Sequence, residues 1–355
     1  MSMTDGIQRR LAKQFIARAQ DLPAYRRRVA VECNGFPEGD LFPFAFPALA
    51  LCADLERGRG ARGAREAASA LVEASRAAVS ARLGDVRVLG PGAREAVYLG
   101  WLALVLARWE QVSGETTHAD ERRHLCAILR TELEALPEGG PLDSFPGMCW
   151  PFDTIPPLLA LKLSDALDGE SRSAAAIERH LVWIETCGSD AATGLPASHV
   201  GRHREPDGAP PRGCDLSLRV GLMKLLDESR ARTIYRQYTR HFWSELFLIA
   251  GFREYPSGHA GHMDADSGPI VLGLGMAATG FGLNATRAAG DSPRGLRLGV
   301  FLFKFDVLWR LAGALFKRQL HGRVMPGLGA PIATDCVTGF LFGDASLVLT
   351  LTWPR

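Results

Sequence analysis

Segments of about 12 to 22 residues with apolar side chains at spacings of three and four recur along the chain, which predicts a series of helices. Irregular segments, often rich in glycine and proline, separate many consecutive pairs. Strand-like alternation is scarce, and the exception is Ser346 to Thr352, where Leu, Val and Thr alternate. Such a chain buries its apolar surface mainly by packing helix against helix.

The expected fold is therefore all-α, an α/α barrel in which helical hairpins close into a ring around a pocket. Inner helices are expected to be apolar and outer ones amphipathic, with loops at one end forming the pocket. The predicted helices cover residues 4–33, 64–83, 92–113, 117–136, 158–167, 171–187, 215–227, 228–250, 269–289 and 296–320, with a further apolar run near 43–55.

The organisation of the chain predicts one domain over residues 1–355, because no linker divides it. This domain includes an N-terminal helix 4–33 and a C-terminal helix plus tail 296–355. The glycine-rich segment 269–289 is expected to be an inner helix, where backbones approach closely.

Charge and cysteine content exclude several classes of protein. The net charge of +2 argues against a nucleic-acid-binding surface. Seven widely spaced cysteines without a C-x-x-C pair argue against a disulfide framework or zinc knuckle and fit a reducing compartment. The N-terminus lacks the apolar run of a secretory signal, and the apolar stretch 298–316 carries three charged residues. We expect a cytoplasmic protein without stable membrane insertion. The sequence does not decide between a monomer and a homo-oligomer.

The segment from Arg253 to Pro269 carries the strongest chemical signal. It holds Glu254, Tyr255, His262, Asp264 and Asp266 just before the glycine-rich helix. Clustered carboxylates raise one another's pKa, so one can act as an acid while another acts as a base. Helix capping explains one of these acids but not the whole set. A metal site would need a rigid ligand set, and no metal motif is present, so we predict none.

A second candidate segment contains Cys149, Trp150 and Asp153 within five residues. The functional interpretation places the thiol and the carboxylate at the rim of the pocket. In the alternative, Asp153 or Thr154 caps the helix that begins near Pro156, and Trp150 packs in the core. A lone cysteine is usually inert and buried.

Four further residues are candidates for substrate binding, together with Trp150, Glu254 and Tyr255. His199 follows a tight turn and could shuttle a proton, or could be a surface histidine. Asp215, beside Cys214, is equally well placed to cap the next helix. Asp40 precedes a helix, where its charge is also favoured by the helix N-terminus.

Four short runs resemble a helical-toroid family that is similar to linalool dehydratase/isomerase and, more remotely, to glycosidases with six helical hairpins. They are Tyr-Leu-Gly-Trp-Leu-Ala-Leu at 98–104, Trp-Pro-Phe-Asp at 150–153, Arg-Glu-Tyr-Pro at 253–256 and Asp-Ala-Asp-Ser-Gly-Pro at 264–269. The resemblance covers roughly residues 90 to 290.

The resemblance implies an α/α barrel and cofactor-free acid–base chemistry on an apolar alcohol. It also implies a pocket that uses cysteine, histidine, tyrosine and carboxylate side chains. Cys149 is the position that matches one of the family's cysteines. The second cysteine has no counterpart, because Leu158 and Leu159 stand in the following helix.

Three functions follow. The first is a cofactor-independent lyase or isomerase on a small, largely apolar hydroxylated substrate, since no phosphate loop, dinucleotide fingerprint or lysine motif is present. The second is a carbohydrate-active hydrolase or epimerase that uses paired carboxylates. The third is a non-catalytic member of the same fold. A pocket lined by Phe and Leu favours the first, stacked Trp beside paired acids the second, and a plugged ring the third.

Overall fold

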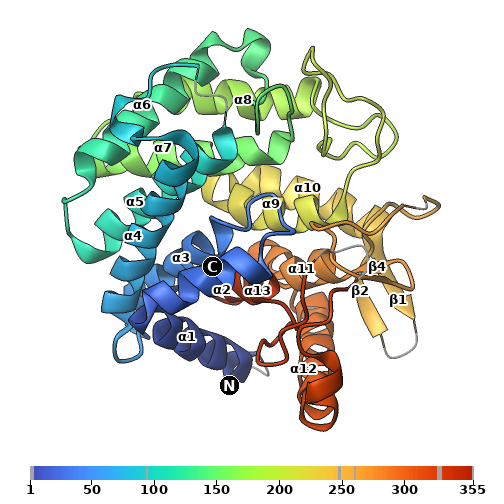
Figure 1. The fold of residues 1–355 in the computed structure, drawn as a ribbon. Helices are drawn as coiled ribbons and strands as arrows, with labels where there is room; N and C mark the ends of the chain where they lie inside the picture. The colour runs from blue at the N-terminus through green and yellow to red at the C-terminus, as the bar shows by residue number, and fades with distance from the viewer. Residues whose placement is uncertain (1–3, 93–94, 247–248, 260, 326–329, 354–355) are drawn as a thin grey trace.

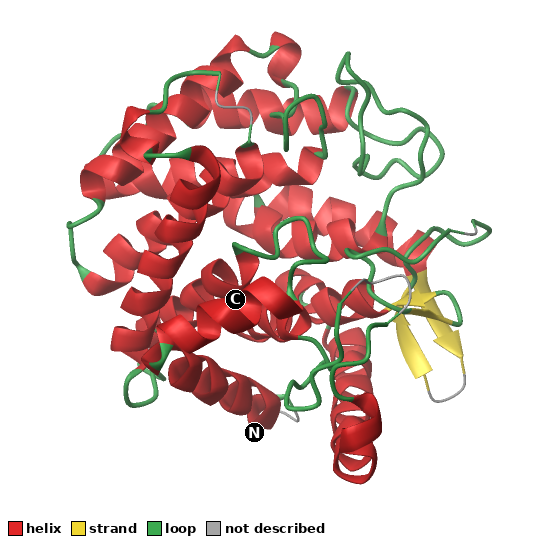
Figure 2. Cartoon of the chain, viewed as in Figure 1, coloured by secondary structure: helices red, strands yellow, loops and turns green. Residues whose placement is uncertain are grey.

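The computed structural model describes residues 4–92, 95–246, 249–259, 261–325 and 330–353 (Figure 1). Helices dominate this part of the chain and strands are few (Figure 2), so the all-α prediction is confirmed. The α-helices are α1 Asp5–Gln20, α2 Leu22–Glu32, α3 Phe42–Glu56, α4 Ala64–Leu83, α5 Ala96–Ser113, α6 Ala119–Ala135, α7 Ile155–Asp168, α8 Ala174–Thr186, α9 Gly213–Leu226, α10 Glu228–Phe242, α11 Met276–Ala289, α12 Ser292–Leu320 and α13 Leu341–Thr352.

Short elements stand between these helices. Three 3₁₀ helices, η1 Val86–Val88, η2 Pro137–Gly139 and η3 Pro151–Thr154, lie in the loops. Strand β1 Trp243–Leu246 pairs antiparallel with β2 Ile249–Phe252, and β3 Ile270–Val271 pairs antiparallel with β4 Leu274–Gly275.

Six helices form a closed inner ring. Helices α3, α5, α7, α9, α11 and α13 each pack against the next, and α13 packs against α3 to complete the circle. Helices α4, α6, α10 and α12 pack on the outside of this ring (Figure 1). Because inner and outer helices alternate along the chain, the inner helices all run in one direction. Their N-termini therefore gather at one end of the barrel.

The burial patterns explain which helices lie inside. In α5, every residue from Ala96 to Trp109 is buried, so no side of the helix faces solvent. In the outer helix α10, the buried residues recur at helical spacing on one face, as Ala231, Ile234 and Tyr238 show. Inner helices also approach closely: a Cβ on Gly100 of α5 would lie 2.4 Å from Pro157 of α7.

The structure corrects the expected N-terminal helix 4–33, which is two helices. The carboxylate of Asp21 accepts a hydrogen bond from the Ala24 N–H at 3.1 Å and caps α2, whose first turn contains Pro23. Proline is favoured there because its missing N–H would have no partner in the first turn.

Three more expectations were wrong in their boundaries or type. The alternating segment Ser346 to Thr352 belongs to helix α13, because both its aliphatic and its threonine side chains are buried within the ring. The expected helix 269–289 begins with the β3–β4 hairpin, whose turn residues Leu272 and Gly273 have φ of 53° and 80°. The expected helix 228–250 ends at Phe242, and β1 begins at the next residue.

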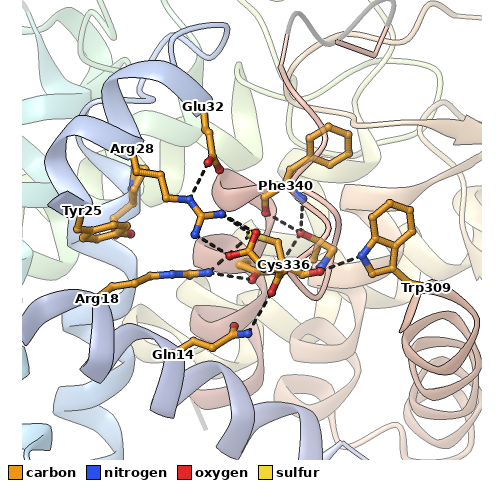
Figure 3. Close-up of polar contacts among 12 residues, drawn as sticks. Gln14, Arg18, Tyr25, Arg28, Glu32, Trp309, Cys336 and Phe340 are labelled. Carbon is orange, nitrogen blue, oxygen red and sulfur yellow. Dashed lines mark hydrogen bonds and ion pairs between the residues drawn. The ribbon is translucent and has the colours of Figure 1, made fainter. Parts of the chain in front are cut away.

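A polar cluster joins the first two helices to the segment before α13 (Figure 3). Arg28 donates to both carboxylate oxygens of Asp335, at 2.7 and 2.8 Å. From α12, the indole Nε1 of Trp309 donates to the carbonyl oxygen of Cys336 at 2.9 Å. These contacts join the segment before α13 to α2 on one side and to α12 on the other. Among the described residues, no helix is long and apolar enough to cross a membrane.

Candidate active site

Four carboxylates come from separate segments at the N-terminal ends of inner helices. Glu38 precedes α3, Asp153 lies in η3 directly before α7, and Asp215 is in the first turn of α9. Asp266 lies in the loop before the β3–β4 hairpin and α11, and the neighbouring Ser267 carbonyl accepts the Ala277 N–H of α11 at 3.1 Å. The common direction of the inner helices thus brings these acids to one end of the ring.

The charges of these carboxylates act on one another. Burial raises the pKa of Asp153 to about 7, and the nearby charges of Asp266 and Asp215 contribute. Burial also raises the pKa of Glu38 well above its usual value, and the charges of Asp266 and Asp153 raise it further. The four side chains therefore form one electrostatic unit, which we call the acid cluster.

Asp266 lies on the wall of a cavity. Water reaches its side chain, which is exposed. Protein nevertheless surrounds the carboxylate closely enough that burial raises its pKa, with a further contribution from the charge of Asp264. A group that is both accessible and poorly solvated is typical of a concave site.

Asp215 is fixed by an arginine one turn further along α9. Arg219 donates to both of its oxygens, at 2.8 and 3.0 Å, and is itself fully buried. The guanidinium lies 5.8 Å from the ring centroid of Phe152, which precedes Asp153. The Nη1 atom of Arg219 has no hydrogen-bond partner among the described residues. The cluster therefore contains one carboxylate that is held against a permanent positive charge.

A second network lies beside the acid cluster and centres on Arg212. Its Nε donates to Glu254 at 2.9 Å, and its two terminal nitrogens donate to the oxygens of Asp264 at 2.6 and 2.7 Å. The thiol of Cys214 donates to the same Glu254 oxygen at 3.1 Å. Burial raises the pKa of Glu254 to about 7, although Arg212 opposes this.

Asp264 organises the loop that carries Asp266. Its Oδ1 accepts hydrogen bonds from the N–H groups of Asp266 and Ser267, at 3.1 and 2.9 Å. Burial acts to raise the pKa of Asp264, but the hydrogen bonds from Arg212 and Ser267 outweigh it and lower this pKa. The geometry gives Asp264 a positioning role for its neighbour.

The backbone beside this network leaves no room for a side chain at Gly213. A Cβ there would lie 2.1 Å from the carbonyl oxygen of Arg253. The Gly213 N–H donates to the carbonyl oxygen of Glu254 at 2.8 Å. The start of α9 is therefore joined directly to the segment that carries Glu254.

An apolar cavity of about 310 Å³ extends from Asp266. Asp266 is the ionisable side chain among its described lining residues, and aromatic side chains form much of the wall. These aromatic residues are Phe36, Phe281, Phe305, Trp309, Phe340 and Phe342.

A larger cavity of about 590 Å³ lies elsewhere in the structure, and Cys149 and His199 are among the residues that line it. The Cys149 thiol donates to the Leu142 carbonyl oxygen at 3.1 Å, and burial raises its pKa to about 12 in spite of the nearby Arg204. A thiol with this pKa is a weak nucleophile. His199 contacts the Asp207 carboxylate through Nδ1 at 2.6 Å, with the Trp150 ring 5.7 Å away.

The predicted site residues thus fall into distinct groups. Asp153, Asp215 and Asp266 meet in the acid cluster, and Cys214, Glu254 and Asp264 meet in the Arg212 network. Tyr255 and His262 lie at its edge, where the tyrosine hydroxyl donates to the His262 carbonyl oxygen at 3.1 Å and the imidazole is exposed. Cys149 and His199 line the larger cavity, and Trp150 packs against the ring of His199. Asp40 accepts a hydrogen bond from Tyr98 at 2.7 Å.

Sequence reasoning missed Glu38, Arg212 and Arg219. Glu38 stands two residues before Asp40, in a segment whose acids were explained by the favourable position of negative charge at a helix N-terminus. Arg219 follows Asp215 at the i, i+4 spacing of a helical ion pair, and this signal was available in the sequence. Arg212 had no such signal, because its partners lie about 40 and 50 residues further along the chain.

Comparisons of sequence find no matching family model and no matching curated protein. Comparison of structure finds the GH76A α-1,6-mannanase from Salegentibacter sp. HEL1_6, with a TM-score of 0.56 and 11% identity over 97% of both chains. An inactive variant of this enzyme in complex with α-1,6-mannotriose also matches, with a TM-score of 0.56 and 12% identity over 97% of both chains. A second inactive variant, in complex with α-1,6-mannotetrose, has a TM-score of 0.51 and 14% identity over 87% of this chain and 88% of that chain.

These matches show that the chain has the six-hairpin α/α toroid fold of glycosidases. The more specific resemblance to linalool dehydratase/isomerase stays a prediction from sequence. The inactive mannanase variants carry replacements of two consecutive aspartates. No two consecutive aspartates occur in this sequence, and its clustered acids come from four separate segments instead.

Proposed function

We propose that the chain is a carbohydrate-active enzyme whose acid cluster cleaves or epimerises a hydroxylated sugar substrate. The observation that carries this proposal is the convergence of Glu38, Asp153, Asp215 and Asp266 at one end of a toroid with a glycosidase fold. Sugar hydrolysis generally needs two carboxyl groups in different protonation states.

Asp153 is the proposed general acid. With a pKa of about 7 it holds its proton at neutral pH in a substantial fraction of molecules. A proton donated to the leaving oxygen lowers the barrier to cleavage most effectively when the donor's pKa lies near the working pH. The Asp266 and Asp215 charges help to keep this pKa high.

Asp215 is the proposed second carboxylate of the pair. Arg219 donates to both of its oxygens, at 2.8 and 3.0 Å, and so fixes its position. A carboxylate in this position can accept a proton from water or stabilise positive charge that develops on the sugar ring. Asp266 and Glu38 would bind substrate hydroxyls, and Arg212 would hold the Asp266 loop in place through Asp264.

A second candidate function is a cofactor-independent lyase or isomerase on an apolar alcohol. The aromatic cavity beside Asp266 favours it, because a hydrocarbon substrate would bury its apolar surface there while a hydroxyl meets the carboxylate. The same acid–base pair would protonate the leaving hydroxyl and remove a proton from carbon.

The two candidates are separated by assaying the purified chain on both substrate classes. One panel contains 4-nitrophenyl glycosides and α-1,6-linked manno-oligosaccharides, and the other contains terpene alcohols analysed for loss of water. We expect turnover in the sugar panel that Asp153→Asn lowers by about 10²- to 10⁴-fold, while the exposed control Asp120→Asn leaves it unchanged. Turnover of terpene alcohols alone would transfer the proposal to the lyase, and full activity of Asp153→Asn would refute the role of the acid cluster.

A further inference from the structure

Helix α12 presents a row of large apolar side chains to solvent. It projects from the body of the ring (Figure 1). Its exposed residues include Phe303, Leu308, Leu311 and Leu315, with 44%, 66%, 55% and 72% of their surface accessible. The spacings of three and four residues place Leu308, Leu311 and Leu315 on one side of the helix, and Phe303 lies at the edge of that side. We call these four residues the α12 ridge.

The ridge lies opposite the side of α12 that packs inward. Leu302, Phe305 and Trp309 of the same helix line the aromatic cavity. These three positions and those of the ridge therefore occupy opposite sides of the helix. The α12 ridge is therefore not needed to cover the core.

The charged side chains around the ridge are almost all cationic. Lys304, Lys317 and Arg318 are exposed, and none has an acidic partner within 4 Å in the described part of the chain. The acidic residue of α12, Asp306, is buried and engaged by Arg10 and Arg310. The outer surface of α12 thus combines apolar side chains with unpaired positive charge.

We propose that the α12 ridge and its flanking cations bind the surface of an anionic lipid bilayer. A helix that lies in the interface inserts Leu and Phe among the acyl chains while Lys and Arg meet the anionic head groups. This proposal does not depend on the reaction that the acid cluster performs.

A second copy of the chain fits the surface less well. In a two-fold symmetric contact the same patch meets itself, so Lys304, Lys317 and Arg318 would face one another across the interface. Like charges at an interface oppose association, whereas anionic head groups neutralise all three.

The test is co-sedimentation of the full chain with vesicles of phosphatidylcholine alone or mixed with phosphatidylglycerol. We expect binding to the mixed vesicles that falls as salt is added. Lys304→Gln, Lys317→Gln and Arg318→Gln combined should weaken this binding by about a hundredfold. Leu308→Ser, Leu311→Ser and Leu315→Ser combined should weaken it by at least about tenfold.

A matched control replaces two exposed valines elsewhere, Val31→Ser and Val88→Ser, which are 70% and 79% accessible. This variant should bind like the wild type, and all variants should keep the wild-type circular dichroism spectrum. The proposal is overturned if the wild type ignores mixed vesicles, or if both α12 variants bind them unchanged. It is also overturned if light scattering shows that the wild type is a dimer, the leucine variant is a monomer, and the wild type does not bind vesicles.

Discussion

Arg212 donates hydrogen bonds from both of its terminal nitrogens to the carboxylate of Asp264, at 2.6 and 2.7 Å, although the two residues are 52 positions apart in the chain. The Nε of the same guanidinium donates to the buried Glu254. One side chain therefore fastens the start of α9 to the two segments before α11. Because the loop of Asp264 also carries Asp266, this contact fixes the position of Asp266 in the acid cluster.

Replacement of Asp264 and replacement of Asp266 should affect the stability of the protein differently. Asp264→Asn removes the ionised partner of Arg212, so it should lower the free energy of unfolding at pH 7 by about 1 kcal/mol. The pKa of Asp264 is lowered on folding, so its stabilising effect exists above the usual pKa of 3.8 and disappears as pH falls through the folded value. Asp266→Asn should not reduce stability, because the pKa of Asp266 is raised on folding. Urea unfolding at pH 7 and in acid distinguishes the two, and equal losses would contradict the positioning role of Asp264.

Asp153→Asn should remove activity and at the same time stabilise the protein at alkaline pH. The pKa of Asp153 rises from 3.8 to about 7 on folding, so the folded state binds more protons between these values. Wild-type stability contributed by this group therefore falls as pH rises from about 4 to about 7. The variant lacks this loss and should be more stable at pH 8 by on the order of 1 kcal/mol. Thermal unfolding at pH 4 and pH 8 measures the difference, and an unstable variant at pH 8 would argue that Asp153 is ionised and paired.

The proposed role of Asp153 also fixes the direction of the pH–rate profile. A general acid must carry its proton. The value of kcat/KM should therefore decline above pH 7, because the pKa of Asp153 is about 7. The profile is recorded on whichever substrate the two panels identify. A rate that rises through this range would instead make Asp153 a base.

Gly213 should tolerate no larger residue. In Gly213→Ala the new Cβ would lie 2.1 Å from the Arg253 carbonyl oxygen, so the backbone must shift, at a cost of about 1–3 kcal/mol. Gly280→Ala is the control, because a Cβ there meets nothing within 4 Å and alanine favours the helix by about 1 kcal/mol. Chemical unfolding of both variants should give changes of opposite sign.

Cys149 should behave as a buried thiol and not as a nucleophile. Burial raises its pKa to about 12, whereas Cys187 is exposed. Alkylation by iodoacetamide at pH 8, followed by peptide mass mapping, should label Cys187 first and Cys149 last or not at all. Rapid labelling of Cys149 together with loss of activity would restore the cysteine as a catalytic candidate.

The periodicity of the chain was sufficient to predict a series of helices, and the recurrence of helix pairs separated by irregular segments suggested that they close into a ring. The α13 segment was misjudged for the same reason that it is central. A helix that is buried on all sides has no polar face, so Leu349 and Thr350 carry no periodic signal. The β3–β4 hairpin was hidden because its glycines also suited a closely packed helix.

The acids of the site were recognisable because they stand in irregular segments or directly before predicted helices. Capping could account for Asp153 and Asp215, but not for the whole set that includes Asp266. Asp153, Asp215 and Asp266 were found in this way. Their partners were harder to find, since an arginine within a helix such as Arg219 is usually a solvated surface residue. The convergence of these acids in one cluster depends on the common direction of the inner helices. No single segment of the sequence encodes this direction.

The contact between α3 and α13 means that the ring cannot close until α13 has been synthesised. Until residues 341–352 leave the ribosome, the face of α3 that α13 covers has no partner, and the nascent chain is an open crescent of apolar helices. Such exposed surface favours aggregation, and contacts so distant in sequence form slowly. We therefore expect the packing of α13 against α3 to determine both the folding rate and the yield of soluble protein.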